Sequence, residues 1–451
     1  MLSAFLFDPD RCTGCQACEL ACSIENDLGT DRSWREVVTF NDAAIPGVHR
    51  FHLSLACNHC AEPACMHSCP ALAYSREAST GAVLIDPSRC IGCRYCSWAC
   101  PYGAPRFEED RGVMGKCTFC SHRLNLGLKP ACATLCPTGA LDFAALPVSE
   151  LNAPVPGFPQ TDLGPAIRIE PVRRRAHLEA VGRPDPGMDS GALSESASHH
   201  GITLRSEWSL AAFTFLTALL FAAFGAASAG ELWVHPILFA AVTIGAAGFS
   251  LAHLGRPERA WRAGMNVRRS WLSREVLGFG AFTAGGTAAL FAGAPLESGF
   301  GATVAVLGVF TLVSADQVYR PVYPGLHPMA DGGGALVTGL YLAGLLLGNP
   351  WIAGLAWSVK VASGTHGALR GEAGSPRRPP VALAIPRVLL GLVLPAAAWI
   401  AWGAPLPAWV LIGAVVGEAL GRAGFYLRLS VQSPARQARV DLSSRLASST
   451  I

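Results

Sequence analysis

Apolar residues are distributed unevenly along the 451 residues of the chain. In the first part they form short runs between polar loops, whereas from Trp208 onward they form long stretches separated by short loops. A helix that crosses a membrane needs about 20 mostly apolar residues. On that criterion the second part predicts an all-α bundle of eight transmembrane helices. The predicted spans are residues 208–229, 234–254, 276–294, 299–318, 335–348, 351–369, 386–402 and 406–427.

Basic residues between these spans predict the orientation of the bundle. An even number of spans places both ends of the bundle on the same side of the membrane. The loops after the second, fourth and sixth spans and the C-terminal tail carry arginines, whereas the opposite loops carry neither lysine nor arginine. By the positive-inside rule we expect both ends, and with them the N-terminal domain, on the cytoplasmic side of the inner membrane.

Shorter patterns in the first part predict a different architecture. Strand-like apolar segments at 3–7, 51–55 and 82–85 each precede a run of cysteines, and a helix-forming segment at 19–25 follows the first run. This recurrence of strand, loop and helix indicates two ferredoxin-like halves, one inserted in the other. We therefore expect an α+β ferredoxin-like domain followed by the transmembrane bundle.

Prolines recur from Pro147 to Pro186, and glycine and serine dominate the segment after them, which predicts a linker. Hydrophobic residues make up 51% of the chain and charged residues 15%, with a formal net charge of +3. This balance indicates contact with membrane lipid and gives no sign of a nucleic-acid partner. The expected domains are residues 1–146 (ferredoxin-like), 147–206 (linker), 207–430 (membrane anchor) and 431–451 (polar, basic tail).

All 16 cysteines lie between residues 12 and 136, in four groups of four. Three cysteines at short spacing followed by a fourth are typical of bacterial ferredoxins, in which the fourth thiolate binds the neighbouring cluster. The pattern therefore predicts four [4Fe–4S] clusters. The groups are Cys12, Cys15, Cys18 and Cys22; Cys57, Cys60, Cys65 and Cys69; Cys90, Cys93, Cys96 and Cys100; and Cys117, Cys120, Cys132 and Cys136.

Disulfides and structural zinc are the alternative uses of these cysteines. Disulfide scaffolds are typical of small secreted domains, and the sequence at Met1 does not resemble a secretory signal. Zinc sites commonly show two separated C-x2-C pairs instead of close triplets with a following Cys-Pro. Iron–sulfur clusters account for the spacing better than either alternative.

Ionisable residues at membrane depth indicate functional sites, because burying them in lipid is costly. His253 ends the second predicted span and Glu275 begins the third, so both can reach one pocket at the membrane edge. An imidazole beside a carboxylate is a suitable acid–base pair for a quinol/quinone half-reaction. The structural alternative is that His253 caps its helix and Glu275 pairs with Arg274 or Arg259. On spacing alone the two alternatives are equal.

Further ionisable residues occur within the predicted spans. Asp316 and Arg320 are four residues apart, as are Glu418 and Arg422, and this spacing favours ion pairs along one helix over a proton path.

Under a rival hypothesis the bundle is a redox-coupled proton-translocating module that uses Asp316, Lys360, His366 and Glu418. His253 and His366 are the one plausible pair of haem ligands, and because both lie near span ends we expect no haem.

Both parts of the chain resemble one known family. The first contains CTGCQACELAC, CNHCAEPAC, CIGCRYCSWACPYGAP, KPACATLCPTGALDF and PAIRIEP, and is similar to the electron-transfer subunit of the dimethyl sulfoxide reductase family of molybdenum enzymes. The second contains EWSLAAFTF, LAHLGRPERA, SREVLG and GEALGRAGFY, and resembles that family's eight-span anchor subunit. These subunits are usually separate chains, and here they are one.

The resemblance implies how the cysteine groups share clusters. Some relatives hold a three-iron cluster where tryptophan replaces a cysteine of the third group, but that group is complete here, so four four-iron clusters are expected. The implied ligand sets are Cys12, Cys15, Cys18 and Cys136; Cys22, Cys117, Cys120 and Cys132; Cys57, Cys60, Cys65 and Cys100; and Cys69, Cys90, Cys93 and Cys96.

The resemblance also implies a menaquinol site at His253, Glu275 and Arg259, and an anchor without haem. We therefore expect a subunit of a quinone-linked molybdopterin oxidoreductase of the kind used in anaerobic respiration. It would carry the menaquinone- or ubiquinone-linked half-reaction, while a separate chain with molybdenum or tungsten would act on the terminal substrate. The alternatives are the proton-translocating module and a quinone-reducing subunit of the sulfite-dehydrogenase type.

Overall fold

The computed structural model describes residues 2–29, 32–45, 47–173, 202–323, 327–369 and 381–448. The chain forms two compact units. The first unit comprises Met1–His200 together with Val431–Ile451, and the second comprises Gly201–Ser430. Residues 174–201, which contain most of the second half of the predicted linker, lie outside the described part.

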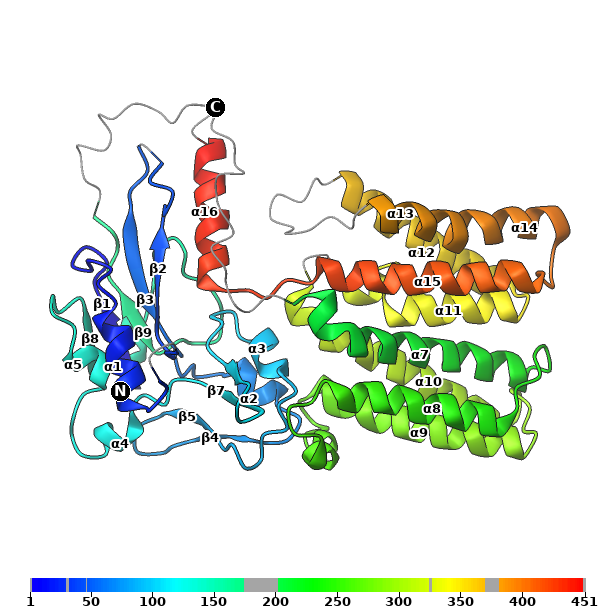
Figure 1. Cartoon of the computed structure of the whole chain (residues 1–451), viewed down its shortest axis with the longest axis horizontal. Helices are drawn as coiled ribbons and strands as arrows, with labels where there is room; N and C mark the ends of the chain where they lie inside the picture. Colours follow the sequence, from blue (N-terminus) through cyan, green and yellow to red (C-terminus); the bar gives the residue numbers. More distant parts are fainter. Residues whose placement is uncertain are drawn as a thin grey trace. The chain divides into compact units, whose positions relative to one another are not determined.

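Small β-sheets build the first unit (Figure 1). In the largest, β1 (Leu2–Phe7) lies between β8 (Leu141–Leu146), to which it is antiparallel, and β9 (Ile167–Ile169), to which it is parallel. Three antiparallel strand pairs accompany this sheet. They are β2 (Glu36–Phe40) with β3 (Phe51–Leu55), β4 (Tyr74–Arg76) with β5 (Val83–Ile85), and β6 (Arg106–Glu108) with β7 (Val113–Gly115).

Short helices follow or contain the cysteine runs. The helix predicted at 19–25 is confirmed as α1 (Ala17–Glu25), and the three predicted strands are confirmed as β1, β3 and β5. None of the other helices described in this unit before residue 173 exceeds five residues. Hydrogen bonds within these helices therefore determine the conformation of only a small part of the chain. They are α2 (Ala64–Ser68), α3 (Tyr95–Ala99), α4 (Ser121–Leu124), α5 (Ala131–Thr134) and the 3-10 turn η1 (Val148–Glu150).

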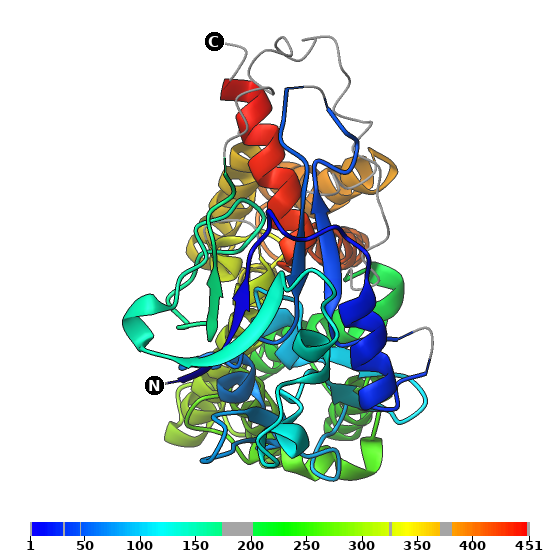
Figure 2. The ribbon, with the colours of Figure 1, turned by 90° about the vertical axis from the view of Figure 1, so that its left-hand side faces the viewer.

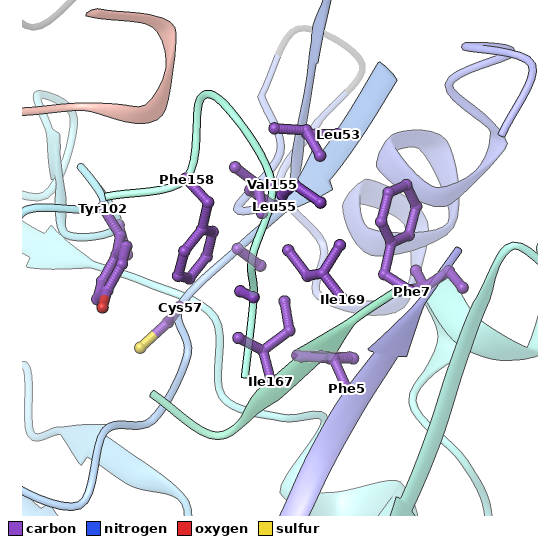
Figure 3. Packing of buried hydrophobic residues seen from close by; sticks show 14 of the residues in the cluster. Phe5, Phe7, Leu53, Leu55, Cys57, Tyr102, Val155, Phe158, Ile167 and Ile169 are labelled. Carbon is purple, nitrogen blue, oxygen red and sulfur yellow. The ribbon is translucent and has the colours of Figure 1, made fainter. Parts of the chain in front are cut away.

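The hydrophobic core of the first unit lies around β1 and extends to the cysteines (Figure 3). Phe5 meets the rings of Phe119 and Phe143 edge to face at centroid distances of 5.2 and 5.3 Å. Phe158 packs against Tyr102 at 5.1 Å, beside the loop that carries Cys57. The core therefore combines aromatic and aliphatic side chains with residues of the cysteine loops.

The first unit continues beyond the predicted domain boundary at residue 146. Val155, Phe158 and Ile167 are buried in its core, and β9 pairs with β1. The prolines in this segment predicted a linker, because they interrupt regular structure. The apolar residues between them bury the segment against the core all the same, so described residues up to 173 belong to the cluster unit.

The tail, predicted to be only polar and basic, contains the helix α16 (Pro434–Ser448), which packs against β2 (Figure 2). Ala438 and Leu442 are buried in the core of the first unit. Asp441 accepts a hydrogen bond from the backbone N–H of Gly157 at 2.7 Å. Residues 438, 442 and 446 share one helix face at i, i+4 spacing and form a narrow apolar stripe. The segment as a whole is polar, so its average hydropathy did not predict this buried face.

Helices form the second unit, with a helical segment at each of the eight predicted spans. Its elements are α7 (Leu204–Ser228), α8 (Pro236–Ala252), η3 (Pro257–Gly264), α9 (Trp271–Phe291), α10 (Gly299–Val318), η4 (Arg320–Val322), η5 (Pro328–Ala330), α11 (Ala335–Leu346), α12 (Pro350–Leu369), α13 (Val381–Val388), η6 (Leu389–Val393), α14 (Leu394–Trp402) and α15 (Ala408–Arg428).

Within the described residues, five helices are long and apolar enough to cross a membrane. The pair formed by α8 and η3, which is bent by 104°, makes a sixth if it is counted as one span. The chain is therefore an integral membrane protein with five or six such helices, and the count of eight spans stays a prediction.

Local sequence signals fix where the helices of the second unit begin and how closely they pack. Thr203 and Ser206 form a reciprocal capping box at the start of α7, and Ser270 and Ser298 cap α9 and α10. A Cβ at Gly308 would lie 2.6 Å from the Phe221 ring. Glycine at this position lets α10 approach α7 closely, as is usual in membrane bundles.

Candidate iron–sulfur and membrane sites

One cavity of the first unit is lined by four cysteines from two distant parts of the chain. Cys57, Cys60 and Cys65 come from the loop after β3 and from α2, and Cys100 follows α3. Burial, reinforced by the thiolates of Cys57 and Cys100, raises the pKa of Cys60 to about 12. Buried thiols that oppose one another's ionisation hold the thiolate form only when positive charge binds among them.

A second cavity is lined by Cys12, Cys15, Cys18 and Cys136. The first three come from the loop between β1 and α1 and from α1 itself, and Cys136 precedes β8. Burial raises the pKa of Cys12, and the thiolates of the other three add to that effect. The Ser54 hydroxyl lies 3.2 Å from the Cys18 sulfur. Four thiols from the beginning and the end of the cysteine-containing segment therefore line this one cavity.

A third group forms around Cys90. Burial raises the pKa of Cys96, and the thiolates of Cys93, Cys69 and Cys90 add to it. The backbone N–H of Met114 donates to the Cys90 sulfur at 3.4 Å. Such N–H to sulfur hydrogen bonds stabilise thiolate charge and are one of the factors that set iron–sulfur reduction potentials.

The fourth group joins the end of α1 to the last cysteine run. Burial raises the pKa of Cys120 to about 11, and the thiolates of Cys132 and Cys22 contribute to the shift. Cys22 is also the strongest thiolate influence on Cys117 after burial. The backbone N–H of Phe119 donates to the Cys117 sulfur at 3.4 Å. In the two cavities, therefore, three cysteines of one run line a space with one cysteine of another, and the electrostatic influence among the remaining cysteines follows the same pattern.

Left-handed backbone conformations shape the cysteine loops. Gly14 and Gln16 have φ values of 71° and 60°, and Gly92 and Arg94 repeat the pattern with 69° and 59°. At Gly14 a Cβ would lie 2.8 Å from the His52 ring. The glycine in CTGC therefore allows a positive φ and leaves room for the His52 ring.

The donor set fits iron–sulfur clusters better than single metal ions. Among the described residues, no three His, Cys, Asp or Glu side chains are grouped to hold one ion. The four thiolates of a four-iron cluster bind four different iron atoms, so they lie farther apart than the ligands of one ion. Cysteine-only groups with peptide N–H donors directed at sulfur match that chemistry.

The predicted quinone-site residues lie on consecutive elements of the second unit. His253 is the C-cap of α8, Arg259 is in η3 and Glu275 is in the second turn of α9. Both helices pack against η3, and the Ser273 hydroxyl donates to the Ala263 carbonyl at 2.7 Å. Glu275 is buried, whereas His253 and Arg259 are partly exposed.

Glu275 lies near a buried ion pair. The charges of Arg422 and Asp316 both act on its carboxylate. Arg422 Nη1 lies 3.7 Å from Asp316 Oδ1, and its Nε–H donates to the Thr214 hydroxyl at 2.9 Å. Asp316 also accepts the backbone N–H of Ala335 at 2.7 Å, at the start of α11. Ion pairs and hydrogen bonds of this network therefore connect α7, α10, α11 and α15, and its charges act on Glu275 of α9.

The predicted ion pairs between Asp316 and Arg320 and between Glu418 and Arg422 are wrong. Asp316 pairs with Arg422, and Glu418 pairs with Lys360 at 2.6 Å. The i, i+4 rule applies to neighbours on an exposed helix face. At these buried positions the charged groups face adjacent helices and find their partners across the bundle, while Arg320 is exposed.

A glycine-rich turn before α11 accepts hydrogen bonds from both buried cations. Lys360 donates to the carbonyl of Gly332 at 2.5 Å and Arg422 to that of Gly333 at 3.0 Å. A Cβ at Gly333 would lie 2.6 Å from the carbonyl oxygen of Gly421. The two ion pairs are thereby joined through one backbone segment. The His366 side chain, the remaining member of the predicted proton path, lies outside the described residues.

Comparisons with known proteins agree with both halves of this description. The family described as a 4Fe-4S dicluster domain matches residues 48–146, and the DMSO reductase anchor subunit family (DmsC) matches residues 202–365. An anaerobic dimethyl sulfoxide reductase polypeptide of Haemophilus influenzae is 41% identical over 183 residues, which cover 37% of this chain and 88% of the relative. This protein belongs to the dimethyl sulfoxide reductase family.

This member of the dimethyl sulfoxide reductase family is also similar to two proteins named for other sulfur compounds. Thiosulfate reductase electron transfer subunit PhsB of Salmonella typhi is 40% identical over 150 residues, 33% of this chain and 78% of the relative. A sulfite dehydrogenase subunit of Allochromatium vinosum is 33% identical over 206 residues, 39% of this chain and 86% of the relative. One polypeptide therefore joins an iron–sulfur electron-transfer subunit to a membrane anchor.

The sequence alone did not predict two buried cations in the cluster unit of this protein. Arg35 precedes β2 and is 1% exposed, and Lys116 follows β7 and is 3% exposed. Neither belongs to a periodic pattern. The one available signal was the position of Lys116 directly before Cys117, whereas nothing around Arg35 in the sequence distinguishes it from a surface arginine.

Proposed function

We propose that this chain transfers electrons between a membrane quinone and a separate molybdopterin-containing catalytic subunit. The observation that carries the proposal is the pair of cavities that are each lined by four cysteines, on a chain whose second half is a membrane anchor. The electrostatic influence among the other cysteines supports two further sets. The Salmonella typhi relative is named as an electron-transfer subunit. We therefore assign the chemistry of the terminal substrate to a partner polypeptide.

The proposal includes four [4Fe–4S] clusters, which when bound supply one-electron carriers in series. Each set takes three thiolates from one run and one from another, as the neighbouring thiols described above support. The proposed ligand sets are Cys12, Cys15, Cys18 and Cys136; Cys22, Cys117, Cys120 and Cys132; Cys57, Cys60, Cys65 and Cys100; and Cys69, Cys90, Cys93 and Cys96.

We assign the quinone half-reaction to His253, Glu275 and Arg259. The buried Glu275 carboxyl and the partly exposed His253 imidazole would exchange protons with the quinone oxygens, and Arg259 would orient the ring substituents. The bundle would span the inner membrane eight times, with the cluster unit facing the cytoplasm, as the arginine distribution supports.

Two alternatives remain distinct from this assignment. The sulfite dehydrogenase relative supports a subunit that delivers electrons to quinone instead of taking them from quinol. A proton-translocating module would use Asp316, Lys360 and Glu418. The contacts of these residues, each in a buried ion pair across helices, favour a structural role.

Metal analysis of the complex isolated anaerobically from its native host tests the proposal. We expect about 16 iron atoms per chain, from four clusters of four, together with molybdenum or tungsten in a large co-purifying polypeptide. Substrate assays on that complex would then identify the reaction. Iron without any molybdenum- or tungsten-bearing partner would contradict the proposal.

A further inference from the structure

Arg35 is a fully buried cation in the core of the cluster unit. Its Nη1–H groups donate to the carbonyl oxygen of Ser54 at 2.9 Å and to the Ser54 hydroxyl at 3.2 Å. Its guanidinium lies 4.3 Å from the centroid of the Phe5 ring, which Figure 3 shows among the core residues. With 1% exposure it has no access to solvent. The fold therefore holds this charge at a fixed position.

The hydrogen-bonding capacity of Arg35 is only partly used. Its Nε and Nη2 atoms have no hydrogen-bond partner among the residues that the structure describes. Within the same residues, no carboxylate forms an ion pair with it. Buried arginines are normally neutralised and their N–H groups satisfied, because an uncompensated buried charge is strongly unfavourable. The charge of Arg35 acts on the Glu19 carboxylate without forming an ion pair with it. The Nε and Nη2 atoms of Arg35 therefore still require hydrogen-bond acceptors.

The charges of several thiolates act on the Arg35 guanidinium. Burial opposes its charge, but the thiolates of Cys132, Cys18, Cys117 and Cys22 overcome that effect and raise the pKa of Arg35. Cys18 belongs to one proposed ligand set, and the other three belong to a second. Ser54, which accepts from Arg35, also contacts the Cys18 sulfur at 3.2 Å. Arg35 is thus connected through Ser54 to one proposed ligand set, and the charges of the second set act on it as well.

We propose that Arg35 is a counter-ion shared by two neighbouring iron–sulfur clusters, and that its Nε–H and Nη2–H groups donate to their sulfur atoms. The inference rests on the proposed ligand sets Cys12, Cys15, Cys18, Cys136 and Cys22, Cys117, Cys120, Cys132. Each cluster with four thiolates is anionic and becomes more so on accepting one electron. A fixed guanidinium stabilises the reduced form more than the oxidised form, so Arg35 raises both reduction potentials without any proton being taken up.

The test is an anaerobic redox titration of the whole purified chain, with dithionite as reductant and electron paramagnetic resonance as readout. In Arg35→Gln, two of the four cluster reduction potentials should fall. A fall of about 59 mV corresponds to a tenfold lower ratio of reduced to oxidised cluster at a given solution potential. The other two should stay unchanged. Arg35→Lys keeps the charge but lacks the planar donors, so the same two potentials should fall by less.

Arg123→Gln is the matched control. Arg123 lies close to Cys120 in sequence, but its charge is already neutralised by Glu25 at 2.9 Å and is partly exposed to solvent. Its loss should leave all four potentials unchanged. Iron and sulfide content, measured in every variant, reports whether the clusters are assembled.

Either variant can refute the proposal. If Arg35→Gln fails to retain iron, the reduction potentials of Arg35→Lys alone test the proposal. Unchanged potentials, or an equal shift of all four, would show that Arg35 serves only the packing of the core. A wild-type protein with fewer than four one-electron couples would instead contradict the proposed number of clusters. That outcome would count against the proposed function, whereas unchanged potentials in the variants would count against the role of Arg35 alone.

Discussion

Among the described residues, each unit of this protein buries one arginine, and the two arginines are neutralised differently. Arg422, in the membrane unit, is 3.7 Å from the Asp316 carboxylate and donates to Thr214. Arg35, in the cluster unit, forms no ion pair with a carboxylate among the described residues; burial disfavours its charge, and the thiolates favour it. The membrane unit therefore supplies the counter-charge of its arginine from a carboxylate. According to our proposal, the cluster unit supplies it from cysteine thiolates and their clusters, so that the counter-charge depends on bound iron.

This difference indicates how each unit depends on its cofactors. The strands of the cluster unit have at most six residues, and most of its cysteines lie within the buried core. The membrane unit has helices of up to 25 residues, and its ion pairs between buried side chains include Lys360 with Glu418 and Arg422 with Asp316. We therefore expect the first unit to fold with iron and the second to fold without it.

Removal of iron should have the largest effect. Oxidation followed by chelation should unfold the cluster unit, because four sets of buried thiols then lose the charge that holds them together. The helices of the membrane unit should remain. Hydrogen exchange detected by mass spectrometry, compared peptide by peptide before and after chelation, measures both units in one sample. Unchanged protection of β1 and β8 after loss of iron would contradict the comparison.

Breaking the membrane ion pair should have the next largest effect. Arg422→Gln leaves Asp316 buried without its partner, which typically costs about 3–5 kcal/mol. The unit should lose thermal stability in detergent, whereas iron content stays unchanged.

The double variant Asp316→Asn with Arg422→Gln removes both charges and should recover most of the lost stability. Lys360→Met, which breaks the second buried pair, with Glu418, is the matched comparison. If the double variant were no more stable than Arg422→Gln alone, the pair would not be the source of the effect.

A smaller effect is expected where the C-terminal helix joins the cluster unit. Leu442→Ala removes a buried side chain that packs in the core, and such truncations cost about 2–5 kcal/mol. Val440→Ala, on the exposed side of α16, is the control and should cost little. The midpoint of thermal bleaching of the iron–sulfur absorption measures both. Equal midpoints would show that α16 is not part of this core.

The smallest predicted effect concerns a surface acid. A hydrogen bond from His122 and the charge of Arg123 lower the pKa of Glu25 below its ordinary value. A lowered pKa in the folded state stabilises the protein above the ordinary pKa and loses that contribution as pH falls through the folded value. Glu25→Gln should therefore cost less than about 1 kcal/mol at neutral pH, and nothing once acid has protonated Glu25. A pH-independent difference would contradict this assignment.

Cysteine spacing and apolar stretches were sufficient to predict the cluster chemistry and the positions of the helices. Both are local signals, read directly from neighbours in the sequence. The partners of Asp316 and Glu418 could not be predicted, because they depend on which helix faces which. The role of Arg35 was equally hidden, since its environment is assembled from β3 and from cysteines far away in the sequence. The burial of α16 depends on three residues in an otherwise polar segment.

Reoxidation of the reduced clusters by quinone tests the central claim most directly, because it asks whether one polypeptide links a quinone to iron–sulfur clusters. The protein would be reduced with dithionite, freed of excess reductant, and mixed anaerobically with a soluble ubiquinone analogue. We predict rapid recovery of the oxidised iron–sulfur absorption in the wild type, and recovery about tenfold to a hundredfold slower in Glu275→Gln and His253→Ala. Ferricyanide should reoxidise all three proteins equally. Equal rates with quinone in the three proteins would contradict the assigned site and, with it, the account of this protein as a link between quinone and clusters.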